Sequence, residues 1–280
     1  MLKQLRFAKA LLRATHLMPS IAVTSFATIF TICLRTAPAT VWLIALATLF
    51  QQFSVGLSND WLDWQRDLAV GRSDKPAMTG DITRSQTRNA AFLFVIAALI
   101  TSWQISAISI AVMLVMLTAG WSYNLWLKST VLSFVPYFIG FGILPYFASG
   151  NGQSAESIPV FIGIVAGLLG CAAHFANSIP DFADDATNLV NGLPQRLGTL
   201  WSSVGLAFCA LAAAITTLLN CTASNATVTL LCLSASIALI MASVALALGQ
   251  KTTRASFNLL VLAALCNLVP LSFEMLAIRA

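Results

Sequence analysis

The sequence predicts an all-α integral membrane protein in which nine transmembrane helices form a single domain over residues 1–280. Three observations support this prediction. Hydrophobic residues make up 58% of the chain and charged residues only 9%, whereas soluble globular proteins carry about 25% charged residues. The apolar residues form runs of roughly 17 to 25 residues, the length at which a helix crosses a bilayer. Nearly all of the few Lys and Arg residues lie in loops on one side of the predicted membrane topology.

The runs follow one another with short polar connections, apart from the longer polar segment 71–88 after the second run. This segment is expected to cover a site. Ser102–Ser106 is expected to form a tight turn between the third and fourth runs, which are both rather short. The expected spans are 18–34, 38–57, 89–104, 106–124, 131–149, 158–178, 199–219, 226–248 and 255–275.

The lysines and arginines sort to one side of this topology. Cytoplasmic loops carry excess Lys and Arg, so we place the basic amino terminus in the cytoplasm. Successive loops then alternate between the two sides of the membrane. Thirteen of the fifteen basic residues then fall inside, and only Arg35 and Arg279 fall outside. The net charge of +5 is therefore interpreted as a topological signature and not as a sign of nucleic-acid binding. We expect an integral protein of a bacterial plasma membrane.

Most acidic residues fall into two clusters. Of the ten acidic residues, five lie in or just after the first cluster and three in the second. Spacing by four keeps side chains on one slowly drifting face of an α-helix. Both clusters are expected at the cytoplasmic ends of spans, where they can face each other. Residues with side-chain oxygens recur at this spacing as Asn59, Asp63 and Asp67, and again as Asn177, Asp181 and Asp185.

Such rows of carboxylates predict a bound cation, because like charges at a membrane interface repel one another unless cations compensate them. Mg²⁺ prefers oxygen ligands and is commonly held by one or two carboxylates together with substrate phosphates. A metal-bound diphosphate above apolar helices predicts an isoprenyl diphosphate as the substrate. The side chains expected to bind its phosphate oxygens are Arg13, Arg72, Lys75, Tyr123, Lys128 and Arg196.

Four sequence segments together resemble the UbiA superfamily of intramembrane prenyltransferases. They are Asn59-Asp60-xx-Asp63-xxx-Asp67, Gly71-Arg72-Ser-Asp-Lys75-Pro-xxx-Gly80, Tyr123-Asn-Leu-Trp-Leu-Lys128, and Asn177-xx-Pro-Asp181-xxx-Asp185 before Gly192. Two details depart from the family pattern. Lys75-Pro76 stands where many quinone-pathway members have Arg-Pro, and Tyr123 and Lys128 are five residues apart where some members have four.

The resemblance implies a helical bundle around a central cavity, Mg²⁺-dependent loss of diphosphate, and transfer of the prenyl group to a lipophilic acceptor. It also implies roles for the motif residues. Asp63, Asp67, Asp181 and Asp185 are the expected catalytic residues, and with Asn59 and Asn177 they are the expected residues around Mg²⁺ and diphosphate.

Several alternatives stay open from the sequence. The same scaffold serves a membrane terpene cyclase that needs no external acceptor, a cation transporter would also use acidic residues, and a catalytically silent member would keep the fold alone. Asp60, Asp74, Asp81 and Asp184 lie outside the four-residue register and either orient a basic neighbour or contact the metal. His174 is expected to pack and form a hydrogen bond.

Overall fold

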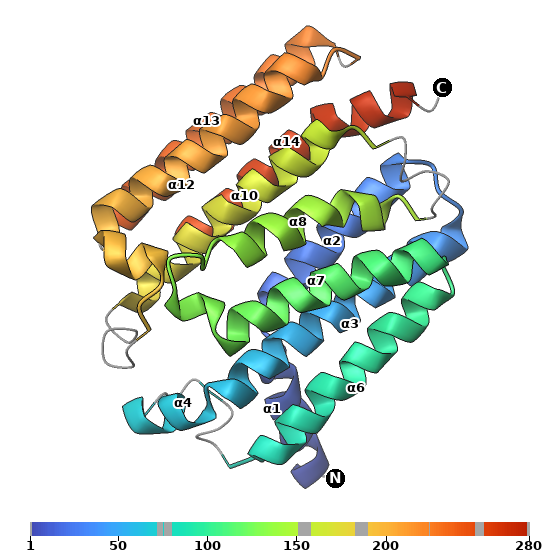
Figure 1. Ribbon diagram of the computed structural model, residues 1–280. Helices are drawn as coiled ribbons and strands as arrows, with labels where there is room; N and C mark the ends of the chain where they lie inside the picture. Colours follow the sequence, from blue (N-terminus) through green and yellow to red (C-terminus); the bar gives the residue numbers. More distant parts are fainter. Residues whose placement is uncertain are drawn as a thin grey trace.

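The protein is an all-α bundle in the computed structural model, which describes residues 2–71, 75, 80–150, 158–182, 190–223, 225–249 and 255–278. These residues form α-helices and two short 3₁₀ helices and contain no strand, so the predicted all-α class is confirmed. Figure 1 shows long helices lying side by side, from α13 and α12 at one edge to α6 at the other.

The helices are α1 (Leu2–Ala14), α2 (Leu17–Cys33), α3 (Pro38–Leu62), α4 (Trp64–Val70), α6 (Arg84–Trp103), α7 (Ala107–Leu125), η1 (Leu127–Ser129), α8 (Val135–Ala148), α10 (Val160–Ser178), η2 (Ile179–Asp181), α12 (Leu193–Asn220), α13 (Ala226–Leu248) and α14 (Ala255–Ile278). A helix therefore lies within or across each of the nine expected runs.

Six of these helices are long and apolar enough to cross a membrane: α3, α7, α10, α12, α13 and α14. α1 and α2 together pass the same test but are bent by 62° at the break between them, which gives up to seven candidate spans among the described residues. The chain is therefore an integral membrane protein. α8 has only 14 residues, and α6 opens with a polar turn, Arg84–Asn89, so nine crossings stay a prediction.

Polar side chains set the beginnings of several helices. Thr83 and Gln86 form a reciprocal capping box at the start of α6, and this satisfies two backbone N–H groups that the helix itself cannot pair. The Ser106 hydroxyl accepts a hydrogen bond from the Ser109 N–H and begins α7. The tight turn predicted at Ser102–Ser106 is confirmed, because α6 ends at Trp103 and α7 begins at Ala107.

Two helices extend beyond their expected ranges toward polar sequence. α3 was expected to end at residue 57 but continues to Leu62, so Asn59 and Asp60 lie on its last turn. α12 begins at Leu193, with Pro194 in its first turn, and contains a non-helical residue at Gly198. Proline suits a first helical turn because the N–H that it lacks has no partner there. The hydropathy of a run thus fixes where a span lies but not where its helix ends.

Sequence analysis did not predict α1, because its basic residues were interpreted as topology signals alone. Ala10 and Ala14 are buried, whereas Arg6, Lys9 and Arg13 are exposed. Ala14 packs in a small cluster with Leu57 of α3 and Ala91 of α6. α1 is therefore an amphipathic helix that joins the bundle through small residues.

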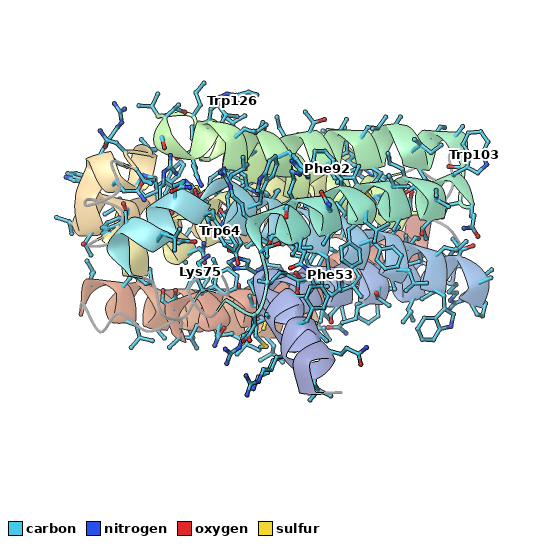
Figure 2. The ribbon with its side chains drawn as sticks, turned by 90° about the horizontal axis from the view of Figure 1, so that it is seen from below. Phe53, Trp64, Lys75, Phe92, Trp103 and Trp126 are labelled. Carbon is cyan, nitrogen blue, oxygen red and sulfur yellow. The ribbon has the colours of Figure 1, made fainter. Side chains whose placement is uncertain are left out.

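Exposed tryptophans lie near the ends of the long helices. Trp42 and Trp103 are both 71% exposed, near the start of α3 and at the end of α6. Trp126 follows α7 and Trp201 lies in the first part of α12, both well exposed. Figure 2 shows Trp103 and Trp126 at opposite ends of the bundle. This distribution fits the two aromatic belts of a membrane protein.

The central helix is α10, which packs against α8, α12 and α14. It is the most buried of the six candidate membrane spans. Its contact with α8 depends on glycine. A Cβ atom at Gly163 would lie 2.9 Å from the Gly142 carbonyl oxygen, one at Gly167 2.9 Å from the Phe138 oxygen, and one at Gly170 2.7 Å from the Tyr137 oxygen. Small residues at this spacing let two membrane helices approach at backbone distance.

We predict that Gly170→Ala destabilises the bundle by about 1 to 3 kcal/mol, because the added methyl group overpacks the contact between α10 and α8. Thermal unfolding of the purified protein in detergent measures this as a lower Tm. Gly140→Ala on α8 is the matched control, since its Cβ would meet the nearest atom, the Ala119 Cβ, at 3.7 Å. Equal Tm values for the two variants would contradict the proposed packing.

Candidate active site

The carboxyl ends of α3 and α10 lie at the same end of the bundle in Figure 1, and each carries one acidic motif. The side of the membrane that this end meets stays a prediction. The turn that carries Lys128, between α7 and α8, lies at this end too, because its side chain contacts the first motif. In Figure 2, Trp64 and Lys75 lie at the end of the bundle that carries α4.

The first motif spans a junction between two helices. α3 ends at Leu62 and α4 begins at Trp64, with Asp63 between them. Helical hydrogen bonds nevertheless continue through the junction, since the Asp63 N–H donates to the Asn59 oxygen and the Asp67 N–H to the Asp63 oxygen, both at 2.9 Å. The expected single helical stripe is therefore wrong in detail. Asn59, Asp63 and Asp67 keep their spacing across a bend.

Asp63 is held between two cations. Its Oδ1 accepts hydrogen bonds from the Lys128 Nζ at 2.5 Å and from the Arg66 Nη1 at 3.0 Å. Lys128 is buried, and this burial lowers the pKa of its ammonium group below the ordinary value, while the Asp63 carboxylate opposes that shift. Lys128 thus lies beside the first motif, and its expected binding of a phosphate oxygen stays a prediction. Sequence analysis missed Arg66, although its position three residues after Asp63 is a recognisable helical pairing.

Asp60 forms a second buried ion pair. Its Oδ1 accepts hydrogen bonds from the Lys75 Nζ at 2.7 Å and from the His16 Nε2 at 2.9 Å. Of the two roles left open for Asp60, the structure shows that it holds a basic neighbour. His16 was not predicted, because only the fold brings the break between α1 and α2 to α3. The Asp60 Oδ2 is also buried and has no hydrogen-bond partner among the described residues.

The second motif departs further from the expected helical stripe. α10 ends at Ser178 and continues as the 3₁₀ helix η2 over Ile179–Asp181. Proline in this turn lacks the N–H that a continued α-helix needs. Asn177 is exposed on the last turn of α10. The Asp181 side chain and the whole of Asp185 lie outside the described residues, so the expected common face of Asn177, Asp181 and Asp185 stays a prediction.

A buried network joins the segment after the second motif to the turn that carries Lys128. The Ser133 Oγ accepts a hydrogen bond from the Leu193 N–H and lies 3.0 Å from the His174 Nε2. A Cβ atom on Gly192 would lie only 2.4 Å from the Lys128 carbonyl oxygen, so glycine permits this close approach. His174 is buried, and its expected hydrogen-bonded packing role is confirmed.

Tyr123 lies half-buried against this network. Its ring makes edge contacts with Tyr137 at 5.2 Å and with His174 at 5.8 Å between ring centroids. Edge-to-face contacts of this kind fix the orientation of an aromatic ring. The expectation that Tyr123 binds a phosphate oxygen stays a prediction.

Three other expected phosphate ligands are not seen at the first motif. Arg13 lies on an exposed face of α1. Arg196 is exposed, and its Nε donates a hydrogen bond to the Asn191 oxygen at 2.9 Å. Arg72 lies outside the described residues, as do Asp74 and Asp184. Their expected roles stay predictions.

The oxygen groups at the first motif fit a hard cation such as Mg²⁺. No three His, Cys, Asp or Glu side chains gather as a metal site within the described part of the chain. Mg²⁺ does not require such a cluster, because it is commonly held by one or two carboxylates plus substrate phosphates. Asn59, Asp63 and Asp67 supply only oxygen atoms, and the two cations now on Asp63 show that this carboxylate attracts positive charge.

Comparison with protein families gives a match to the UbiA prenyltransferase family over residues 20–265. The chain belongs to this family. The match covers both acidic motifs and the two lysines that pair with the first motif, Lys75 and Lys128. The whole of α1 and the break at His16 lie before it. A comparison with curated protein sequences finds no match.

Solved structures of UbiA proteins share the fold. A UbiA homologue from Aeropyrum pernix K1 has a TM-score of 0.75 and 16% identity, covering 90% of this chain and 96% of its own. A homologue from Archaeoglobus fulgidus bound to DMAPP and Mg²⁺ has a TM-score of 0.73 and 15% identity, with 97% and 99% covered. A digeranylgeranylglyceryl phosphate synthase structure has a TM-score of 0.67 and 17% identity over the full length of both chains.

We predict that Lys128→Met strengthens the binding of Mg²⁺ alone roughly five- to tenfold, because the Lys128 ammonium group competes for the Asp63 carboxylate. Isothermal titration of the purified protein with MgCl₂ measures this change. Arg66→Met is the matched control and should have a smaller effect, since Arg66 is more exposed and exposed ion pairs are weak. Unchanged Mg²⁺ affinity in Lys128→Met would show that Asp63 does not bind the metal.

Proposed function

We propose that this UbiA-family protein catalyses Mg²⁺-dependent transfer of an isoprenyl group from a polyprenyl diphosphate to a lipophilic acceptor, with release of diphosphate. The observation that carries this proposal is the pairing of Asp63 with the buried Lys128 at the end of an apolar bundle. One group attracts a metal ion and the other attracts a phosphate. A relative of the same fold is known with DMAPP and Mg²⁺.

The proposal assigns two sets of residues. The oxygen donors Asn59, Asp63, Asp67, Asn177, Asp181 and Asp185 hold Mg²⁺, in part through the diphosphate. The donors Arg13, Arg72, Lys75, Tyr123, Lys128 and Arg196 bind phosphate oxygens. When bound, Mg²⁺ stabilises the negative charge that develops on the leaving diphosphate.

The chain itself supplies orientation and positive charge. Lys128 lies in a short turn whose backbone is packed against Gly192, so its ammonium group is positioned before the substrate binds. Preorganised donors of this kind stabilise a transition state because they need little rearrangement as charge develops. Lys75 lies in the same end of the bundle and adds a second cation.

The apolar helices give the hydrocarbon chain of the donor a place to lie. Breaking the bond between the allylic carbon and its oxygen leaves an allylic cation, which water would capture. A site at the end of a bundle of apolar helices excludes water until the acceptor attacks. This division between a polar end and an apolar body supports a substrate with a diphosphate head and an isoprenyl tail.

We also propose that the site and the amino terminus face the cytoplasm of a bacterial cell and that nine helices cross the membrane. The distribution of lysines and arginines supports this orientation. α8 needs help from its neighbours to cross, because 14 residues extend about 21 Å at 1.5 Å per residue. The turn 130–134 before α8 and residues 149–150 after it therefore extend the proposed fifth crossing.

We predict that Asp63→Asn lowers the rate of diphosphate release at least about a hundredfold, because the amide removes the negative charge that holds the metal. Asp181→Asn should have a similar effect. Glu274→Gln is the matched control: Glu274 accepts hydrogen bonds from the Thr222 and Ala223 N–H groups, far from the motifs, and should leave turnover unchanged. Full turnover in Asp63→Asn would refute the mechanism.

A second experiment tests the reaction itself. The purified protein is incubated with Mg²⁺, isoprenyl diphosphates of several lengths, and a panel of aromatic and other lipophilic acceptors, and diphosphate release and product mass are followed. We expect release that depends on the acceptor and a product heavier than the acceptor by one prenyl group. A hydrocarbon product formed without acceptor would indicate a terpene cyclase, and no release with any donor would contradict both activities.

A further inference from the structure

The break between α1 and α2 lies against α3, close to the first acidic motif. Thr15 stands at this break, and a Cβ atom on Gly56 would lie 2.6 Å from the Thr15 carbonyl oxygen. The Ser20 Oγ also donates a hydrogen bond to that oxygen at 2.8 Å. Gly56 precedes Asp60 by one helical turn, so the break is fixed beside the face of α3 that carries Asp60.

His16 occupies an unusual backbone conformation at this break. Its φ of 51° and ψ of 57° are left-handed, a region that costs a residue with a side chain of this kind free energy. Surrounding structure must maintain such a conformation, and strain of this type gathers at functional sites. The conformation directs the His16 ring to Asp60, where the Nε2 donates its hydrogen bond at 2.9 Å.

Asp60 connects His16 to Lys75. The two donors approach the same oxygen, Oδ1, and the carboxylate is 6% exposed, while the Lys75 side chain is 11% exposed. The positive charge of Lys75 is also one of the charges that lower the pKa of Lys128. Asp60 and Asp63 lie three residues apart at the end of α3, so Lys75 is held close to the pair of Asp63 and Lys128.

We propose that His16 and Asp60 are positioning residues that hold the Lys75 ammonium group in place for the diphosphate of the donor. The break between α1 and α2 thereby becomes a third part of the donor site, beside the two acidic motifs. This inference rests on the proposed function. His16 lies before the region that matches the family model, residues 20–265.

The test measures binding of geranyl diphosphate in the presence of Mg²⁺ to the purified full-length protein, with no acceptor present. His16→Gly should weaken this binding about tenfold, because it removes a hydrogen bond to a charged group. Lys75→Met should weaken it at least as much. In the double variant, His16→Gly should cause less than about a twofold further loss, since interacting residues are not additive.

Arg35→Gly is the matched control. Arg35 also has a positive φ, 53°, but lies at the other end of α2. Glycine relieves backbone strain at both positions, and in His16→Gly this relief offsets the lost hydrogen bond to Asp60, so both variants should stay folded, whereas only His16→Gly should weaken binding. Asp60→Asn, alone and with Lys75→Met, gives a second cycle that does not depend on how His16→Gly folds.

The outcomes separate the two proposals. The positioning role is overturned if His16→Gly and Asp60→Asn weaken binding by the same factor in the Lys75→Met background as in the wild-type background. It is also overturned if neither variant weakens binding. In both cases the proposed function stands. If the wild-type protein does not bind geranyl diphosphate with Mg²⁺, the proposed function fails and the inference fails with it. Loss of binding in Asp63→Asn, with the predicted non-additive cycles, supports both.

Discussion

The structure depends on the pairing of buried carboxylates with lysines at one end of an apolar bundle. A charged group taken out of water loses several kcal/mol of hydration, so it persists only beside an opposite charge. Asp63 meets Lys128, which is 65 residues further along the chain, and Asp60 meets Lys75. Each pair joins α3 to a different segment. The charges therefore hold Lys75 and Lys128 beside the end of α3.

The close packing of α8 on α10 brings the second half of the chain to these pairs. Glycines on α10 bring its backbone to that of α8, and α8 follows directly after the turn that carries Lys128. Ser133 lies two residues before α8, and its Oγ forms hydrogen bonds with the His174 Nε2 and the Leu193 N–H. A contact between small residues inside the membrane is thus linked, through one helix and one turn, to the position of a lysine at the site.

Much of this architecture could be predicted from the sequence, because a run of apolar residues in lipid must pair its own backbone groups and so becomes a helix. Each expected run contains one. The bend at Asp63 and the 3₁₀ turn at Ile179–Asp181 were missed, since a four-residue spacing describes a straight helix and does not report where one ends.

Lys128 was expected to bind phosphate oxygens, and no spacing in the chain specifies its pairing with Asp63 of the first motif. His16 and Arg66 were missed for different reasons. Arg66 had a local signal, its position three residues after Asp63, but was counted as a topology residue. His16 had no local signal, because its role depends on its left-handed backbone and on the close approach of Thr15 to α3 that Gly56 permits. Tertiary contacts of this kind are not visible in composition or periodicity.

The two ion pairs also bear on how such a site binds a metal. A cation that binds Asp63 shares this carboxylate with Lys128 and Arg66, which both donate to Oδ1, and their positive charges weaken the binding of a metal by itself. Lys128 stays nearby, because its turn is packed against Gly192. A diphosphate that arrives with the metal supplies new partners for the lysine, so the two ligands favour each other's binding. An arrangement in which lysine charges balance the carboxylate charges therefore favours the metal and the diphosphate together over either one alone.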